Sequence, residues 1–209
     1  MALKARDDIH IARRLWHFFG VLLIAAAYWA LDPRQSAVAV IAVSSFIIGF
    51  DWLRLRLTLV NRFFQWVFRP FLRQSEADRM SGSSTLMAGI TVIVLLFPRN
   101  VVLLTLLFFA LADPLASYFG IRYGKRDKLI GNKSLQGSLA AFAACFVMSL
   151  LFYTIHDLMR ERLFIVGLLS GLVGAFSELV PIWRIDDNFV FPVMCAMLLT
   201  GLFYVFGGL

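Results

Sequence analysis

Long apolar segments recur along the whole chain, and they constrain its fold more than any other feature. A helix that crosses a bilayer needs about 20 mostly apolar residues. Segments close to that length cover residues 14–31, 36–52, 83–98, 100–120, 135–156, 163–181 and 188–207. Because similar segments follow the first one, the first is not interpreted as a cleaved signal peptide. The pattern predicts an all-α polytopic membrane protein with about seven transmembrane helices.

Composition supports the same class. Of the 209 residues, 60% are hydrophobic and only 16% are charged, whereas a soluble domain carries about 25% charged residues. The net charge of +7 could suggest nucleic acid. In a membrane protein it more often reflects basic cytoplasmic loops, so we expect no nucleic-acid partner. The chain shows no internal repeat and no low-complexity linker, and residues 1–209 are interpreted as a single domain.

The distribution of Lys and Arg predicts the orientation in the membrane. Sixteen of the 20 basic residues fall on one side of the predicted spans, and Arg34, Arg99, Arg160 and Arg162 fall on the other. The positive-inside bias then places the amino terminus in the cytoplasm and the carboxyl terminus outside. Seven spans, an odd number, agree with that. We expect the bacterial cytoplasmic membrane or an equivalent one.

Residues 53–80 do not have the composition of a span. Arginines at 54, 56, 62, 69, 73 and 79 alternate with Leu, Val, Phe and Trp. This pattern is typical of an interfacial amphipathic helix, and Pro70 is the expected break. Such a helix could anchor the chain on anionic lipid or guide a lipid substrate sideways into a site.

Several acidic residues lack a simple structural explanation. Asp113 lies about two turns before the end of the fourth predicted span. A charge at membrane depth costs several kcal/mol, so it usually faces a cavity, an ion or a partner, although a structural pair with an arginine is an alternative. The full set is Glu76, Asp113, Glu178, Asp186 and Asp187.

The last of these acids favour a metal site. Glu178 ends the sixth predicted span, and Asp186, Asp187 and Asn188 begin the seventh. Asp186 could be a helix N-cap with Asp187 in the first turn, which would account for one acid but poorly for two. Clustered carboxylates with an amide suit Mg²⁺ or another divalent cation. The candidate metal ligands are therefore Asp113, Glu178, Asp186 and Asp187.

Residues 120–138 are basic and rich in glycine, which is typical of a loop that could hold phosphate. Glycines let backbone N–H groups approach phosphate oxygens, and Lys133 and Ser134 directly precede the fifth predicted span. The spacing is not that of a Walker A motif, and ordinary topological charge is the alternative. Arg13, Arg14 and His17 begin the first span, where snorkelling cations are equally common. Cations and carboxylates on one side of an apolar body predict a membrane enzyme that handles a phosphorylated soluble donor and a lipid.

Six short motifs resemble those of one family, and they occur in that family's order. They are "RRLWH" (13–17), Glu76 with "SGSSTLMAG" (81–89), "ADPLASYFGIRYGK" (112–125), "NKSLQGS" (132–138), "ELVP" (178–181) and "IDDNFVFP" (185–192). The sequence is similar to the CTP-dependent lipid kinases, which include dolichol kinase, phytol kinase and the yeast-type diacylglycerol kinase. The resemblance implies transfer of the γ-phosphate of CTP, as co-substrate, to a lipid hydroxyl with a divalent metal.

The resemblance and the residue patterns together give the candidate site. The catalytic candidates are Asp113, Lys133, Glu178 and Asp187. The candidates for nucleotide contact are Arg13, Arg14, His17, Gly120, Gly124, Lys125, Asn132, Lys133, Ser134, Gln136 and Asn188. Two positions depart from the family, since Ala112 stands where Gly is common and Gln136 where Glu is usual. If that Glu binds the metal or acts as a base in the family, Glu178 and Asp187 take its place here or the reaction is slower.

Other functions remain open from the sequence. A phosphatidate cytidylyltransferase would also use CTP, metal and cytoplasmic carboxylates, but it would release pyrophosphate. A small transporter or lipid scaffold would be favoured by broken helices and inverted repeats, and the chain shows neither. The lipid acceptor, the choice of CTP over ATP and the oligomeric state are not fixed by any motif.

Overall fold

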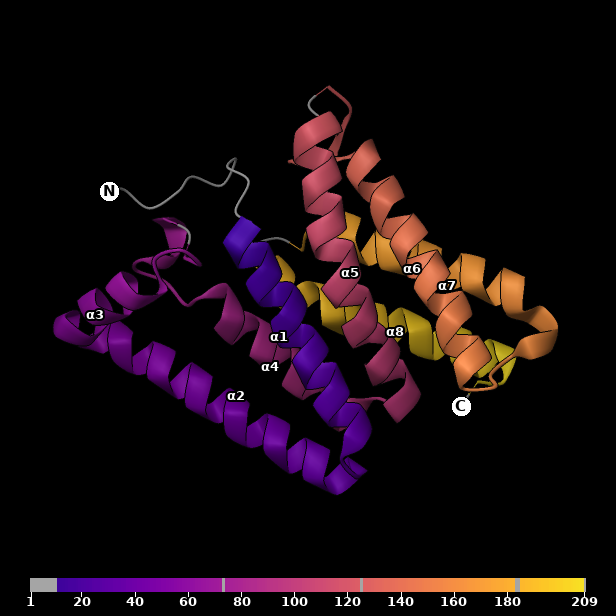
Figure 1. Ribbon diagram of the computed structural model, residues 1–209, viewed down its shortest axis with the longest axis horizontal. Helices are drawn as coiled ribbons and strands as arrows, with labels where there is room; N and C mark the ends of the chain where they lie inside the picture. Colours follow the sequence, from indigo (N-terminus) through magenta and orange to yellow (C-terminus); the bar gives the residue numbers. More distant parts are fainter. Residues whose placement is uncertain (1–10, 73, 125, 183–184, 209) are drawn as a thin grey trace.

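The computed structural model describes residues 11–72, 74–124, 126–182 and 185–208, and these residues form eight α-helices, two short 3-10 turns and one small hairpin. The helices are α1 (Ile11–Ala30), α2 (Pro33–Arg56), α3 (Thr58–Phe68), α4 (Gly82–Leu96), α5 (Arg99–Tyr123), α6 (Leu135–Ile155), α7 (Leu163–Leu179) and α8 (Asp187–Phe206). The 3-10 turns are η1 (Gln74–Glu76) and η2 (Arg160–Arg162). Figure 1 shows their arrangement.

The chain is a helical membrane protein. Five helical segments are long and apolar enough to cross a bilayer, namely α2, α5, α6, Arg160–Leu179 with α7, and α8. The apolar helix α4 is shorter, and the first two turns of α1 contain Arg13, Arg14 and His17, which lower its mean hydropathy. Every predicted span coincides with one of the helices α1, α2 and α4 to α8, with ends within four residues of those predicted.

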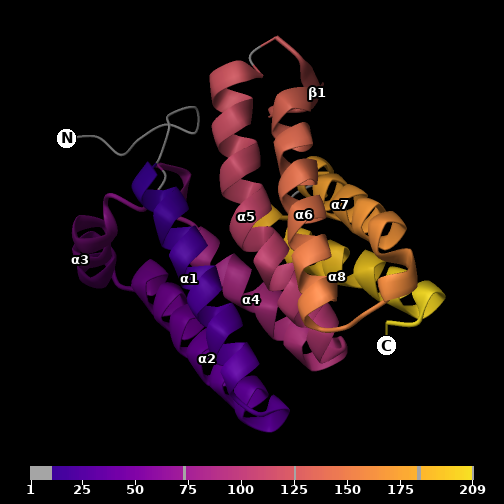
Figure 2. The same ribbon diagram turned by 45° about the vertical axis from the view of Figure 1, so that its right-hand side comes forward.

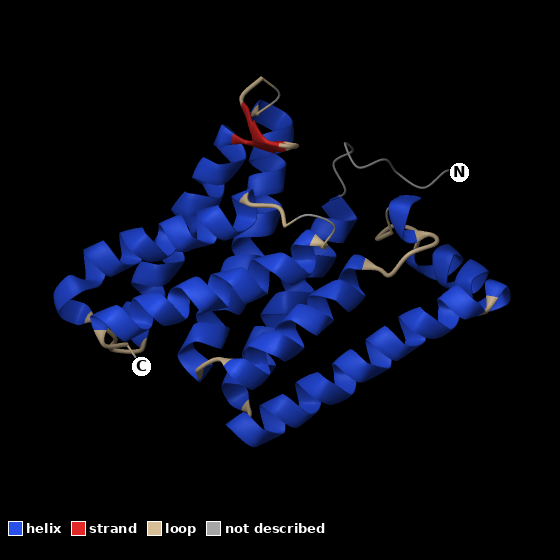
Figure 3. Cartoon of the chain, turned by 180° about the vertical axis from the view of Figure 1, so that it is seen from behind, coloured by secondary structure: helices blue, strands red, loops and turns tan. Residues whose placement is uncertain are grey.

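The prediction of an all-α chain is confirmed, and residues 128–134 add one small hairpin to the helices. Strands β1 (Lys128–Ile130) and β2 (Lys133–Ser134) pair antiparallel, with Lys128 opposite Ser134. Gly131 in the turn between them has φ +56°, a conformation that glycine adopts without strain. The hairpin joins α5 to α6 and is drawn in red in Figure 3.

Helix α5 forms the centre of the molecule. Its face includes Val101, Leu104, Phe108 and Ala112, all buried, and it packs against α1, α6, α7 and α8 (Figure 2). Helix α7 approaches α6 closely because its glycines leave room; a Cβ on Gly174 would overlap Cys145 Sγ. Cys145 and Cys195 are both buried free thiols.

One end of the bundle gathers the polar residues. Arg14 near the start of α1 reaches Ser117 near the end of α5, and Thr85 at the start of α4 reaches Asp186 just before α8. Lys133 of the hairpin reaches Glu178 near the end of α7. The start of α1, α4, α6 and α8 and the end of α5 and α7 therefore lie together, on the side marked by the hairpin in Figure 1.

Candidate active site

Four predicted catalytic residues lie around one pocket, although they come from four separate elements. Asp113 of α5, Lys133 of β2, Glu178 of α7 and Asp187 of α8 line it, with apolar walls from Phe109, Val190 and Phe191. Lys133 Nζ lies 2.5 Å from Glu178 Oε1 and 3.7 Å from Asp187 Oδ2. A cation and three carboxylates thus meet where an apolar body opens at one end.

The surroundings of Lys133 stabilise its charged form. Burial alone would lower the pKa of its ammonium, but the carboxylates of Glu178, Asp113 and Asp187 act in the opposite direction and outweigh it. The pKa is therefore raised above the ordinary value. Lys133 remains a cation at neutral pH, which suits a group that holds phosphate oxygens.

Arg14 provides a second cation beside Asp113. Arg14 Nη2 donates a hydrogen bond of 2.9 Å to Ser117 Oγ, and the Asp113 carboxylate acts on the guanidinium electrostatically. Arg14 Nη1 is buried without a hydrogen-bond acceptor. A buried donor without an acceptor is costly, so this nitrogen suits an anionic ligand at the same end of the bundle.

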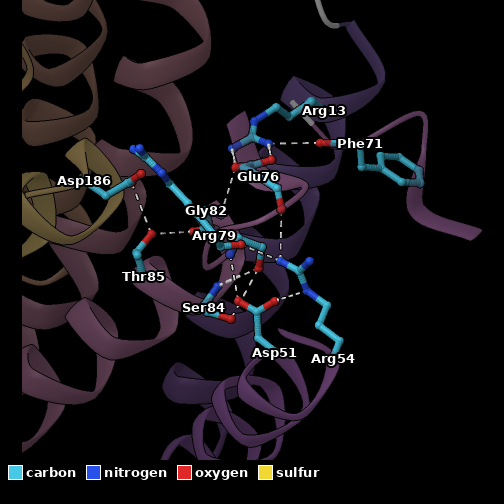
Figure 4. Close-up of polar contacts among 11 residues, drawn as sticks. Arg13, Asp51, Arg54, Phe71, Glu76, Arg79, Gly82, Ser84, Thr85 and Asp186 are labelled. Carbon is cyan, nitrogen blue, oxygen red and sulfur yellow. Dashed lines mark hydrogen bonds and ion pairs between the residues drawn. The ribbon is translucent and has the colours of Figure 1, made fainter. Parts of the chain in front are cut away.

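Arg13 has a different environment, although it is the neighbour of Arg14. Its two terminal nitrogens donate to the Glu76 carboxylate at 2.6 and 2.8 Å, and Nη1 also donates to the carbonyl of Phe71 (Figure 4). Arg13 is buried, and so is His17 one turn further along α1. The structure therefore brings Arg14, rather than Arg13, towards Asp113.

The glycines before and after the hairpin make room for side chains and backbone. A Cβ on Gly124 would overlap Ser134 Oγ, and one on Gly137 would lie 2.7 Å from the carbonyl of Ala116. A Cβ on Gly120 would lie 3.0 Å from the same Ser134 hydroxyl. These contacts give Gly120 and Gly124 a packing role, since they let α5 and α6 meet closely at the base of the hairpin.

The remaining nucleotide candidates are spread over the hairpin and the two helix starts. Ser134 caps α6 by accepting from Gly137 N, and Gln136 Nε2 donates to Asp127 Oδ2 while its Oε1 is buried without a partner. Asn132 is exposed in the turn, and its carbonyl accepts from Lys128 Nζ. Asn188 lies in the first turn of α8. Lys125 lies outside the described residues.

Asp186 is not among the residues that line the pocket. Its Oδ1 accepts from Asn188 N at 2.9 Å and caps α8, and the same oxygen accepts from Thr85 Oγ1 at 3.2 Å. This is the capping position that the sequence allowed for it.

The carboxylates of the pocket are the candidate ligands for a divalent cation. Among the described residues, no group of three or more His, Cys, Asp or Glu is arranged to hold a metal ion unaided. Mg²⁺ needs only one or two carboxylates when substrate phosphates complete its shell. Asp113 and Asp187 line the pocket, and Lys133 is paired there with both Glu178 and Asp187.

Sequence reasoning missed a second polar cluster, between the end of α2 and the start of α4. Arg54, assigned above to an interfacial segment, is fully buried, and its guanidinium contacts the Asp51 carboxylate and the carbonyls of Glu76 and Arg79 (Figure 4). Asp51 Oδ2 in turn accepts from Ser81 N at 2.7 Å. The available signal was a pair of opposite charges three residues apart near the end of an apolar helix, which share one face.

Comparison with known proteins identifies similar chains. CTP-dependent diacylglycerol kinase 1 of Schizosaccharomyces pombe is 33% identical over 193 residues, covering 87% of this chain and 86% of that protein. The proteins of the same name from Saccharomyces cerevisiae and Eremothecium gossypii are 27% and 26% identical and are covered over 63% and 65% of their lengths. The chain thus spans less than two thirds of these two longer relatives. No family model and no solved structure matches the chain.

Proposed function

This chain belongs to the family of CTP-dependent lipid kinases, and from that premise we propose that its acceptor is the free hydroxyl of diacylglycerol. The choice of acceptor rests on the names of the three similar proteins described above, which are diacylglycerol kinases. Polyprenols such as dolichol and phytol-like alcohols are the other acceptors in the family that the motifs resemble. The phosphoryl donor is CTP.

The observation that carries the site assignment is the meeting of Asp113, Lys133, Glu178 and Asp187 in one pocket. Phosphoryl transfer depends mostly on positioning and on neutralising the charge of the phosphates. Lys133 supplies a partly buried cation for that purpose, and Arg14 supplies a second one with an unused donor. The apolar walls of the pocket suit the hydroxyl end of a lipid.

The oxygen of the lipid hydroxyl attacks the γ-phosphorus of CTP, the bond from that phosphorus to the β,γ-bridging oxygen breaks, and CDP leaves. Asp113 accepts the hydroxyl proton, while Lys133 and Arg14 hold phosphate oxygens. A divalent cation bound with the nucleotide would supply further charge neutralisation, with Asp113 and Asp187 as its protein ligands and Glu178 as a further one once Lys133 turns to phosphate.

We propose seven spans, formed by α1, α2 and α4 to α8, in a single domain with a cytoplasmic amino terminus and an external carboxyl terminus. The excess of Lys and Arg on one side supports this orientation in a bacterial cytoplasmic membrane or an equivalent one. Helix α3 would lie in the interface, since none of its residues is buried and Leu59, Phe63 and Trp66 are exposed. The proposed site then opens on the cytoplasmic side, where CTP is present.

The alternatives are not favoured. A cytidylyltransferase would attack the α-phosphorus and release pyrophosphate, and the similar proteins carry the name of kinases. A transporter or scaffold would not need this collection of phosphate-holding and carboxylate groups at one end of the bundle.

The proposed acceptor can be tested directly. Purified protein is incubated with each nucleoside triphosphate and with diacylglycerol, dolichol or phytol, and both products are identified. We expect CTP and diacylglycerol to give phosphatidate and CDP. Faster phosphorylation of dolichol or phytol would contradict the proposed acceptor, and preferred use of ATP would contradict the donor.

A further inference from the structure

Glu76 lies outside the pocket, yet its carboxylate receives three hydrogen bonds from two other elements. It accepts from both terminal nitrogens of Arg13 on α1 and, at 2.9 Å, from the backbone N–H of Gly82 at the start of α4. Glu76 is only 6% exposed. A buried carboxylate with this many donors holds its neighbours in one arrangement.

The backbone around Glu76 is also held, by hydrogen bonds from side chains of α2 and α3. The fully buried guanidinium of Arg54 donates to the carbonyl of Glu76 at 3.1 Å and to that of Arg79 at 2.7 Å. Asn61 Nδ2 and Gln65 Nε2 both donate to the carbonyl of Ala77. Figure 4 shows the contacts of Arg54 with Asp51 and with the backbone of Glu76 and Arg79. The segment that carries Glu76 is therefore held on both its side chain and its main chain.

Gly82 connects this cluster to α8. A Cβ at Gly82 would collide with Arg13 Nη2, would lie 2.6 Å from Asn188 Nδ2 and would lie 3.1 Å from Glu76 Oε1. The lack of a side chain at Gly82 therefore allows Arg13, Glu76 and Asn188 to meet around one backbone position. Asn188 belongs to the first turn of α8.

Thr85, one turn after Gly82, makes a second connection to the same place. Its hydroxyl donates to Asp186 Oδ1, the oxygen that caps α8 (Figure 4). Asp187, which lines the pocket, stands between the two residues that α4 contacts, Asp186 and Asn188. The start of α4 therefore sets the position of the first turn of α8.

We propose that Glu76 is a positioning residue, which acts through Arg13, Gly82 and the start of α8 to place the carboxylate of Asp187 in the pocket. The inference rests on the proposed function, because it is the pocket of that function in which Asp187 serves. It also gives Arg13 a role different from that of Arg14: Arg13 orders the protein, and Arg14 faces the phosphates.

The first test measures position rather than activity. A cysteine is introduced by Asp187→Cys, and its rate of reaction with a soluble maleimide is measured in detergent with and without Glu76→Gln. The native cysteines are buried at 0% exposure and remain in place. A matched site is Leu135→Cys at the start of α6, since Leu135 is 44% exposed and the Asp187 side chain 42%.

We expect Glu76→Gln to accelerate labelling severalfold at position 187 and to leave labelling at position 135 unchanged. Equal acceleration at both positions would indicate general loosening and would overturn the proposal, as would no acceleration at either. Thr85→Val provides a milder variant that removes the hydrogen bonds of this hydroxyl to Asp186 and to the carbonyl of Gly82. It should shift labelling at position 187 in the same direction by a smaller factor.

The second test measures turnover in the chain with its native Asp187. A catalytic group displaced by about 1 Å can lose about 100-fold in rate, so Glu76→Gln and Gly82→Ala should each reduce CTP-dependent phosphorylation on that scale. Gly201→Ala in α8 is the control, because a Cβ there meets nothing within 4 Å, and it should retain full turnover.

The two proposals fail in different ways. A native chain that phosphorylates no lipid alcohol with CTP would reject the proposed function, and selective acceleration at position 187 would then still support the positioning role. An active native chain in which Glu76→Gln changes neither labelling nor turnover would reject the positioning role alone.

Discussion

At the scale of single residues, Lys133 is the cation that best separates phosphate binding from membrane topology. Lys133→Ala removes an ammonium that lies in the pocket, 2.5 Å from Glu178. We expect weaker CTP binding and turnover lower by about 100-fold, as for loss of one donor to developing negative charge. Lys128→Ala is the matched control on the same hairpin, because Lys128 is exposed. Equal kinetics for native protein and Lys133→Ala would show that the basic loop only sets the orientation in the membrane.

Lys133 also leads to a prediction about pH. Burial lowers the pKa of its ammonium, but Glu178, Asp113 and Asp187 raise it by more, so the net shift is upward. A raised lysine pKa means that the stabilising pairing is complete below the ordinary value of about 10.4 and is lost as pH rises through the higher folded value. CTP affinity should therefore show no titration from Lys133 between about pH 6 and about pH 9. Loss of affinity in that range that disappears in Lys133→Arg would contradict this assignment.

A substitution at Asp113 distinguishes a catalytic role from a structural one. Asp113→Asn keeps size and hydrogen bonding but removes the charge, which lowers the cost of burial. We expect activity to fall by about 100-fold or more, with thermal stability unchanged or raised. A structural ion pair with Arg14 would give the reverse, because a stranded buried cation costs about 3–5 kcal/mol. Both quantities are measured on one purified variant, with Asp157→Asn on the opposite side as control.

At the scale of elements, the junction of α5 and α6 depends on glycine. A Cβ at Gly124 would overlap the Ser134 hydroxyl, and that side chain cannot move without losing its capping bond to α6. Gly124→Ala should destabilise the protein by about 1–3 kcal/mol, as overpacking does. Gly49→Ala, in open space on α2, should not lower the melting temperature. A melting temperature unaffected by Gly124→Ala would show that the hairpin tolerates a wider separation of the two helices.

The helices were predictable from the sequence, whereas the hairpin was not. Apolar length determines a membrane helix, so the predicted segment 135–156 matches α6, and segment 163–181 matches α7. Residues 128–134 have no alternating apolar pattern that would favour strands; they pair because α5 and α6 bring their ends together.

The candidate site was predictable in part, for a similar reason. Acids at membrane depth are unusual enough to stand out, and Asp113, Glu178 and Asp187 do meet in one pocket. The division between Arg13 and Arg14 was not predictable, because adjacent arginines look alike until tertiary structure places Glu76 beside one and Ser117 beside the other. Arg54 was likewise assigned to the interface, since a sequence does not show that a segment folds back over it.

At the scale of the whole molecule, the proposed site requires that the end of the bundle with the pocket face the cytoplasm. Single cysteines near Asp78 and Arg126 should react from the cytoplasmic side, and one near Asp157 should react from outside, because the positive-inside bias places them so. The buried native cysteines should contribute little background. Labelling of position 126 from outside would place the pocket on the wrong side for CTP and would contradict the site assignment.

The central claim is that the pocket transfers the γ-phosphate of CTP to a lipid hydroxyl. The most direct measurement uses two samples of CTP, one with radiolabel in the γ-phosphate and one in the α-phosphate, each incubated with the protein and diacylglycerol. The account predicts that γ-label appears in the lipid product and that α-label remains in soluble CDP. Recovery of α-label in the lipid, with release of pyrophosphate, would contradict it.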